Sequence, residues 1–327
     1  MVRGCILYLM ISISGLTKIY RVPDKKDGIF PALLHVVRPK YRSINALDHI
    51  DVEIEKGEIV GYIGENGAGK TTTMKLLSGL LTPTSGTVNV LGFTPSERDF
   101  TYLKQIGFVM GQKNQLWWDL PVLESFKLQK EIYEIPDRKF HSALNELVDL
   151  LEVKTLLHQP VRNLSLGQRM KCELINVLIY RPSILFLDEP TIGLDVITQT
   201  KVRNFLKEYN QKYKATIILT SHSMDDIEDL CSRVILINKG KKMYDGSISQ
   251  LIQKHIPHKT ITLQLASKRG IEALSSLPCP HDLQYPTLIV KPSRDQTTEI
   301  VRQLLSLCDI TDMDIKEPSL EDVVRTL

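Results

Sequence analysis

The sequence predicts an α/β fold in which a mostly parallel β-sheet is covered by helices. From Glu58 onward, short apolar runs alternate with segments whose apolar residues recur at helical spacing, a pattern typical of parallel strands joined by helices. Between Leu116 and Asn163 the strand pattern stops and helical spacing continues alone. We therefore expect a sheet domain that carries a helical insert at about residues 113–165.

The expected strands are runs rich in isoleucine, valine and leucine, which favour the extended conformation. They lie at residues 10–19, 59–63, 106–110, 184–187, 216–220 and 234–237. Met10 is a second position at which translation can start, so residues 1–10 are predicted to be an upstream extension and residues 11–250 the main domain.

A second, smaller domain is predicted at residues 256–327, because the pattern restarts after Asp245-Gly246. Its expected elements are strands at 261–265, 288–291 and 310–315 and helices at 271–277 and 297–307. Strands and helices mixed within so short a stretch indicate an α+β domain. The stretch contains no group of residues with the spacing of a catalytic site.

Composition excludes several classes of protein. With 43% hydrophobic and 24% charged residues among 327, the chain is globular rather than disordered or fibrous. The 41 basic and 38 acidic residues leave a net charge of +3, too little for a general nucleic-acid-binding surface. The five cysteines show no pairing or metal-ligand spacing, so reduced thiols are expected. No apolar run reaches the length of a membrane-spanning helix.

A phosphate-binding loop is predicted at residues 64–71, Gly-Glu-Asn-Gly-Ala-Gly-Lys-Thr, between an expected strand and an expected helix. Its glycines allow backbone N–H groups to turn toward phosphate oxygens, and the N-terminus of the following helix adds positive potential. In such a loop Lys70 reaches the terminal phosphates and the Thr71 hydroxyl binds Mg²⁺.

Two adjacent carboxylates, Asp188 and Glu189, follow the apolar strand expected at 184–187. A carboxylate at the end of such a strand completes the magnesium site from the side opposite Thr71. We expect Asp188 to bind the metal through water, and Glu189 to act as general base for an attacking water.

The sequence Leu-Ser-Leu-Gly-Gln at residues 164–168 resembles the signature of the ATP-binding subunits of ABC transporters. Other landmarks of that family are matched as well. Gln112 resembles the glutamine that senses magnesium and the attacking water, Leu194-Asp195 resembles the D-loop, and His222 resembles the switch histidine. Tyr41 resembles the aromatic residue that stacks on adenine. The resemblance covers about residues 11–250.

This resemblance implies a P-loop NTPase fold with an antiparallel β subdomain beside the parallel sheet. It implies catalytic roles for Glu189, His222 and Lys70, and metal contacts from Thr71, Gln112 and Asp188. The nucleotide-binding residues it implies are Tyr41, Gly64, Glu65, Asn66, Gly67, Ala68, Gly69, Lys70, Thr71 and Thr72. The residues it implies for contact with the nucleotide of a second subunit are Ser165, Leu166, Gly167 and Gln168, with Asp195 of the D-loop beside them.

Some of these residues also allow a purely structural interpretation. Tyr41 could be a core aromatic, and His222 an ordinary hydrogen-bonded histidine. Ser165 and Gln168 fit a capping box, in which each side chain binds the backbone N–H of the other residue. A capped helix N-terminus can also bind an anion, so the structural and the functional interpretation can both hold. Leu166 stands where the family has glycine. As the first residue of a helix it keeps its N–H available, so we expect contact with a phosphate to survive. We expect the distance at which the phosphate can approach, and the rate of turnover, to change.

The family resemblance implies an ATPase that uses ATP and Mg²⁺ and forms a dimer, with an identical or a similar chain. Its other partner would be an integral-membrane permease, which places it at the cytoplasmic face of the membrane. The pair Trp117-Trp118 is a candidate permease contact, with core packing as the alternative. No nucleic-acid partner is expected.

Three stretches are most similar to the daunorubicin or viologen exporter type: residues 71–73, residues 117–121 and residues 164–170. The small C-terminal domain, which ends with residues 317–322, also resembles that group. This similarity implies export of a drug-like, lipid or polysaccharide substrate. Two alternatives remain open: an energy-coupling subunit of an importer, and an ATP-gated clamp on ribosome or nucleic acid.

Overall fold

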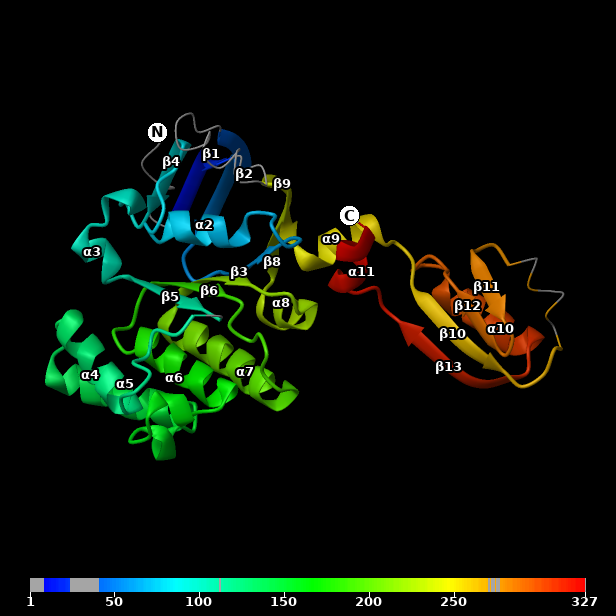
Figure 1. Cartoon of the computed structure of the whole chain (residues 1–327). Coiled ribbons are helices and arrows are strands. Elements are labelled where there is room, and N and C mark those ends of the chain that lie inside the picture. Colours follow the sequence, from blue (N-terminus) through cyan, green and yellow to red (C-terminus); the bar gives the residue numbers. More distant parts are fainter. Residues whose placement is uncertain are drawn as a thin grey trace, which may run out of the picture. The chain divides into compact units, whose positions relative to one another are not determined.

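The computed structural model describes residues 9–23, 41–111, 113–269, 271, 274 and 277–326. It divides into two compact units, Met1–Asp245 and Gly246–Leu327 (Figure 1). The proposed extension at residues 1–10 lies outside the described residues except for its last two, and Cys5 and Gln112 lie outside them as well. No helix within the described ranges is long and apolar enough to cross a membrane.

A six-stranded sheet forms the centre of the first unit. Its strands, in spatial order, are β5 (Ile106–Met110), β6 (Ile184–Asp188), β7 (Thr216–Thr220), β3 (Ile59–Ile63), β8 (Arg233–Asn238) and β9 (Lys241–Ser247). The pairs β5–β6, β6–β7, β7–β3 and β3–β8 are parallel. The carboxyl ends of these strands therefore meet at one edge, where open α/β sheets place their ligands.

Helices cover both faces of this sheet. In Figure 1, α2 (Lys70–Leu77) lies on one side, and α6 (Leu166–Leu178) and α7 (Val196–Tyr213) lie on the other. A further helix, α8 (Met224–Leu230), follows β7. Because both faces are covered, all five residues of β7 are buried. The predicted parallel core is confirmed, and its strand bounds agree with the sequence prediction to within one residue.

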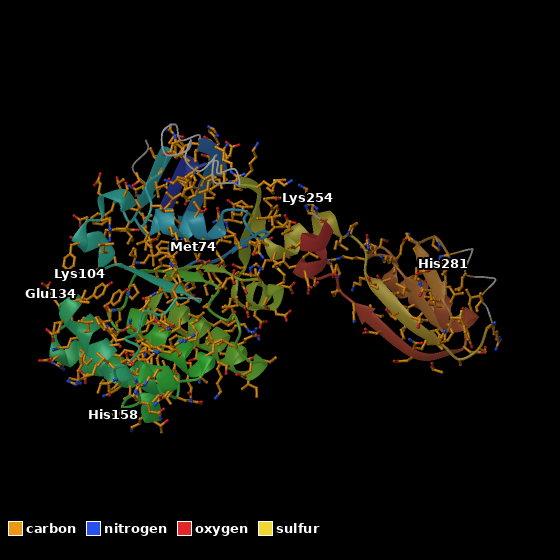
Figure 2. All side chains as sticks on the ribbon, viewed as in Figure 1. Met74, Lys104, Glu134, His158, Lys254 and His281 are labelled. Carbon is orange, nitrogen blue, oxygen red and sulfur yellow. The ribbon has the colours of Figure 1, made fainter. Side chains whose placement is uncertain are left out.

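A three-stranded antiparallel sheet lies beside α2, with the order β2 (Tyr41–Glu55), β1 (Leu9–Pro23) and β4 (Ser85–Val90). Its apolar residues join those of β3 and α2 in one core that includes the fully buried Met74, labelled in Figure 2. This sheet is the antiparallel subdomain implied by the family resemblance. The first strand is longer than the expected residues 10–19.

The region between β5 and β6 is helical. It contains α4 (Val122–Ile132) and α5 (Asp137–Leu150), with short 3₁₀ turns at Lys154–Leu156 and Val161–Asn163. The buried residues of α5 recur at three- and four-residue spacing, which is the periodicity of a half-buried helix. Two shorter elements precede β5: a 3₁₀ turn at Pro95–Glu97 and α3 (Phe100–Leu103).

The second unit contains a four-stranded antiparallel sheet in the order β11 (His281–Gln284), β12 (Thr287–Val290), β10 (Thr260–Leu265) and β13 (Ile310–Lys316). Its helices are α9 (Ile248–His255), α10 (Thr297–Leu307) and α11 (Leu320–Thr326). Strand β11 was missed in the sequence prediction, and most of the helix expected at 271–277 lies outside the described residues. The four described cysteines are free and buried.

Candidate active site

The loop between β3 and α2 folds around the ammonium group of Lys70. The Lys70 Nζ donates to the backbone oxygens of Gly64 at 2.7 Å and Glu65 at 3.0 Å. Burial lowers the pKa of this ammonium, and the nearby carboxylates of Glu189 and Asp188 partly oppose that shift. A lysine held in this way lies inside the loop, with its charge at the start of α2.

Gly69 makes the turn into α2 possible. Its φ of 112° lies in a region that side chains rarely adopt, and a Cβ atom there would lie 2.6 Å from the Ala46 oxygen. The middle of β2 therefore lies directly against the loop. This close approach explains a glycine at position 69 by local sterics.

Asp188, the last residue of β6, joins that strand to α2 and to β7 at the sheet edge. Its Oδ2 accepts from the Thr71 hydroxyl at 2.9 Å, and its Oδ1 accepts from the Thr220 hydroxyl at 2.7 Å. Thr71 belongs to α2, which follows β3, and Thr220 ends β7. The parallel sheet thus brings the loop threonine and the strand-end carboxylate together, as their positions in the sequence predicted.

Glu189 and His222 face each other one residue further along. The Glu189 Oε1 and the His222 Nε2 lie 2.9 Å apart. Glu189 has a φ of 56°, an uncommon backbone conformation for glutamate. Its backbone N–H donates to the Thr220 oxygen and hydroxyl, both at 3.1 Å. This strained backbone turns the carboxylate away from β6 toward His222, and such strain is frequent at functional sites.

A cavity of about 170 Å³ lies between these groups and the segment after β5. It is lined by Thr71, Lys75, Met110, Gly111, Lys113, Asp188 and Glu189. A hydroxyl and a carboxylate on one wall are the oxygen donors that Mg²⁺ uses when nucleotide phosphates supply the rest of its shell. The donor set therefore fits magnesium bound together with a nucleotide, whereas no cluster of three or more metal-binding side chains occurs in the described part of the chain.

A buried carboxylate, Asp226, fixes the two loops that carry Glu189 and His222. It accepts from the hydroxyls of Thr191 and Ser221, the second at 2.9 Å. It also pairs with Arg203 of α7 at 2.7 Å. The role of this residue could not be predicted from the sequence, because its contacts join three separate segments of the chain.

The signature segment begins α6 in the predicted manner. Ser165 Oγ accepts from the Gln168 N–H at 3.2 Å, and Gln168 Oε1 accepts from the Ser165 N–H at 2.9 Å, which is a complete capping box. Leu166 is the first helical residue and remains 36% exposed. The Gln168 side chain is therefore engaged within its own helix.

The D-loop lies against the signature segment. A Cβ atom on Gly193 would lie 2.7 Å from Leu166 Cδ2, so the leucine covers this glycine. Asp195 caps α7 through the Thr198 N–H at 2.9 Å and the Thr198 hydroxyl at 2.7 Å. The first two residues of α7, Val196 and Ile197, are more than 70% exposed. Two apolar side chains thus project beside the signature segment.

Two tyrosines are candidates for the adenine contact. Tyr41 is exposed at the start of β2, five residues from Ala46, which lies against the phosphate-binding loop. Tyr20 of β1 pairs with Ile44, only two residues from Ala46. Tyr20 was not predicted from the sequence, but the register of β1 on β2 puts it nearer the loop than Tyr41. Gln112, the glutamine predicted to sense magnesium and the attacking water, lies outside the described residues.

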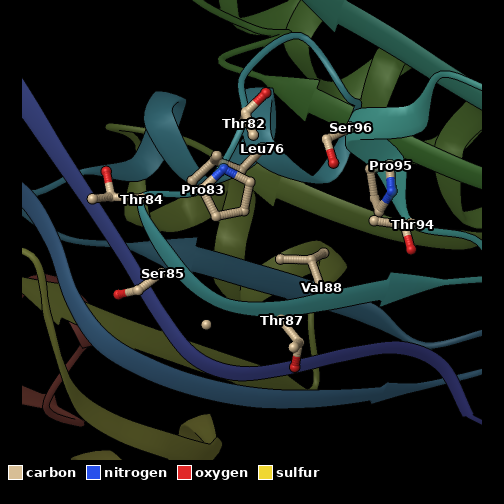
Figure 3. Close-up of a pocket in the computed structure, with 11 residues that line it drawn as sticks. Leu76, Thr82, Pro83, Thr84, Ser85, Thr87, Val88, Thr94, Pro95 and Ser96 are labelled. Atoms are coloured by element: carbon tan, nitrogen blue, oxygen red, sulfur yellow. The ribbon is translucent and has the colours of Figure 1, made fainter.

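A second cavity, of about 310 Å³, lies between β4 and the turn at Pro95–Glu97 (Figure 3). Thr82, Thr84, Thr87 and Ser96 are among the residues that line it, and none of the described lining residues carries a charged side chain. It therefore lacks the cations and carboxylates found at the edge of the parallel sheet.

Comparison with known proteins agrees with this geometry. The family model described as "ABC transporter" matches residues 47–192. The chain is 30% identical over 214 residues to the ABC transporter ATP-binding protein NatA of Bacillus subtilis, a match that covers 65% of this chain and 87% of the relative. It is 33% identical to the methionine import ATP-binding protein MetN 2 of Enterococcus faecalis, covering 66% and 63% of the two chains. It is 32% identical to the Nod factor export ATP-binding protein I of Cupriavidus metallidurans, covering 67% and 72%.

The fold is also found among solved structures. A dimeric structure of a post-hydrolysis state of the ATP-binding cassette MJ0796, bound to ADP and Pi, superposes with a TM-score of 0.60 at 24% identity. The match covers 73% of this chain and 98% of that one. The phosphate-binding loop, the Asp188-Glu189 pair and this fold define an ATPase of the P-loop class. The chain belongs to the family of ABC transporter ATP-binding subunits.

Proposed function

We propose that the chain hydrolyses ATP at a site completed by a second subunit and thereby powers a separate permease that exports a drug-like, lipid or polysaccharide substrate. The observation that carries the hydrolytic part is the arrangement at the sheet edge. Asp188 binds Thr71, and Glu189 faces His222. Thr71, Asp188 and Glu189 line a small cavity beside the phosphate-binding loop.

In this proposal Lys70 and the backbone N–H groups of residues 64–72 bind the nucleotide phosphates. Glu189 is the general base for the attacking water, and His222, 2.9 Å away, contacts the γ-phosphate and orients that carboxylate. Thr71 and Asp188, with Gln112, would hold Mg²⁺, which supplies charge neutralisation for the phosphates. Tyr41 or Tyr20 stacks on the adenine.

We infer that the second subunit is another copy of this chain or a similar one. The signature residues Ser165, Leu166 and Gly167 and the D-loop then face the nucleotide held by the partner's phosphate-binding loop. The exposed apolar pair Val196 and Ile197 supports an interface at this edge. The dimeric state of the MJ0796 cassette supports the same arrangement.

A surface formed by Trp117, Trp118 and Leu120 is the proposed contact with the permease. All three side chains are between 43% and 56% exposed, whereas the preceding Leu116 is buried. Trp117 and Trp118 are the two tryptophans of the sequence. Exposed tryptophans are typical of protein interfaces. Their exposure favours the interface interpretation over core packing.

Export is the direction we propose, and the daunorubicin or viologen exporter type is the subtype. The support is the set of similar stretches at residues 71–73, 117–121 and 164–170 and in the C-terminal domain, together with the export relative. The import relative keeps an importer as the alternative. An ATP-gated clamp on ribosome or nucleic acid has less support, because the net charge is only +3.

Affinity purification from detergent-solubilised native membranes tests this proposal. We expect a multi-span permease to co-purify with the wild-type chain, and to be lost when Trp118 is replaced by alanine. Leu128→Ala is the matched control, because it removes an exposed apolar side chain of α4. Recovery of ribosomes or nucleic acid without any membrane protein would contradict the transport function and leave the ATPase chemistry in place. A co-purifying extracellular binding protein would favour import.

A further inference from the structure

The segment at residues 113–118, which follows β5, is anchored by one buried carboxylate to α6, the helix that begins with the signature. Glu173 lies on α6, eight residues after Ser165, and is only 3% exposed. Its Oε1 accepts from the backbone N–H of Gln115 at 2.8 Å and of Leu116 at 3.2 Å. Its Oε2 has no hydrogen-bond partner among the described residues. Burial raises the pKa of this carboxyl above its ordinary value, and the two N–H groups partly oppose that shift.

A packing role alone does not explain a carboxylate at this position. An apolar residue on the buried face of a helix avoids the cost of desolvating a charge and of leaving an oxygen unpaired. The two N–H groups belong to a loop, where they have no strand or helix partner, so they require an acceptor. Glu173 supplies that acceptor from a different element.

Two further contacts hold the same segment. The Gln115 side chain donates to the Phe108 oxygen of β5 at 2.6 Å. The Arg169 guanidinium, on the first turn of α6, lies 5.9 Å from the Trp118 ring. The segment is thus bound at one end to the strand that leads to Gln112, and along its length to the helix that begins with the signature.

We propose that Glu173 is a positioning residue that couples the segment after Gln112 to the signature helix, so that a nucleotide-linked movement of one is transmitted to the other. The segment leads from the cavity that contains Gly111 and Lys113 to the exposed Trp117 and Trp118. The helix carries the residues that we propose to meet the partner's nucleotide. One rigid link therefore joins the nucleotide site, the proposed permease surface and the signature. The inference rests on the proposed roles of the signature and of Gln112.

The chain contains its own reporter for this link. Trp117 and Trp118 are its only tryptophans, and they come directly after Leu116. Their emission therefore reports on the segment that Glu173 holds. We expect Mg-ATP to change that emission in the purified wild-type protein, and a wild-type protein that binds ATP without any change would overturn the proposal.

The decisive variants are Glu173→Ala and Glu173→Gln, compared by ATP affinity, ATP turnover and tryptophan emission. Alanine removes the acceptor, so we expect turnover to fall about 10-fold and the ATP-linked emission change to be lost, while ATP affinity stays within about 3-fold. Glutamine keeps an acceptor oxygen, so we expect it to restore both signals to within about 3-fold of wild type. Wild-type turnover with a full emission response in Glu173→Ala would overturn the proposal, as would a Glu173→Gln variant as impaired as Glu173→Ala.

Glu146→Ala is the control for simple destabilisation. Glu146 is a partly buried carboxylate that pairs with Lys212 at 2.7 Å and Arg181 at 3.1 Å, and none of these residues belongs to the segment. We expect a lower melting temperature with a normal emission response. If Glu173→Ala yields no folded protein, Glu173→Leu replaces it, because leucine fills a similar buried volume and still removes the acceptor of the Gln115 and Leu116 N–H groups. Normal turnover and emission response in Glu173→Leu would then overturn the proposal. Absence of ATP turnover in the wild-type protein itself would contradict the proposed function instead.

Discussion

The phosphate-binding edge and the signature edge of the same unit differ in how completely their side chains are engaged. At the first edge, Lys70, Thr71 and Asp188 all have partners within the chain. At the second edge, Leu166, Val196 and Ile197 project into solvent. The polar groups that we propose to bind phosphate are thus assembled by one chain, whereas the apolar side chains of the signature edge are exposed. This difference supports two half-sites that are completed only in a dimer.

The largest expected effect comes from Glu189 at the phosphate-binding edge. Replacing it with glutamine removes the proposed base but keeps the size of the side chain, so turnover should fall by roughly 100-fold to 10,000-fold. ATP affinity should stay unchanged, because the groups that hold phosphate are intact. Steady-state hydrolysis and nucleotide titration measure the two quantities. Unchanged turnover would remove the proposed role of Glu189.

Replacing Asp226 should lower the free energy of unfolding more than it lowers the rate of ATP turnover. Asp226→Ala leaves Arg203 without its buried partner and frees the loops after β6 and β7. We expect the free energy of unfolding to fall by about 3–5 kcal/mol. Denaturant titration measures this loss. Asp229→Ala is the control, since Asp229 pairs with the same arginine at 3.0 Å but is half exposed. Equal losses in both variants would contradict the importance of the buried network.

The two tyrosines give a smaller effect that discriminates between them. Loss of the ring that stacks on adenine should weaken ATP binding by about 10-fold. The melting temperature measured without nucleotide should change little. From the strand register, Tyr20→Ala should show this loss and Tyr41→Ala should show less than about 3-fold. Titration of each variant with ATP decides the assignment. A loss confined to Tyr41→Ala would restore the sequence-based choice.

The smallest effect is expected at the signature edge. Leu166→Gly removes the half-exposed side chain that covers Gly193, and so allows a phosphate to approach the start of α6 more closely. We expect turnover to rise by about 3-fold, a barrier change below about 1 kcal/mol. Unfolding should become easier by about 0.5–1 kcal/mol, because glycine loses more backbone freedom than leucine when it enters a helix. A fall in turnover would mean that Leu166 itself contributes to the site.

The sequence predicted best those features that depend on local pattern. Runs such as Ile59–Ile63 and Thr216–Thr220 are apolar and β-branched because both faces of their sheet are covered, so their bounds could be predicted residue by residue. The phosphate-binding loop and the Asp188-Glu189 pair depend on short spacings, and the structure brings them together. The capping box of Ser165 and Gln168 is equally local.

The features that were missed depend on long-range contacts. Strand β11 reads His-Asp-Leu-Gln, an edge strand with no apolar alternation. Asp226 and Glu173 are carboxylates on helices, and only the fold reveals that they are buried beside loops that need acceptors. The preference for Tyr20 over Tyr41 follows from the register of two strands separated by a long connection, which no local pattern specifies.

We expect ATP to join two incomplete half-sites, and sedimentation of the Glu189→Gln variant tests this expectation. With hydrolysis blocked, bound ATP should hold the phosphate-binding edge of one copy against the signature edge of another. We expect a dimer at saturating Mg-ATP and a monomer with ADP or without nucleotide. A variant that binds ATP and remains monomeric at all protein concentrations would contradict a site shared between two copies of this chain.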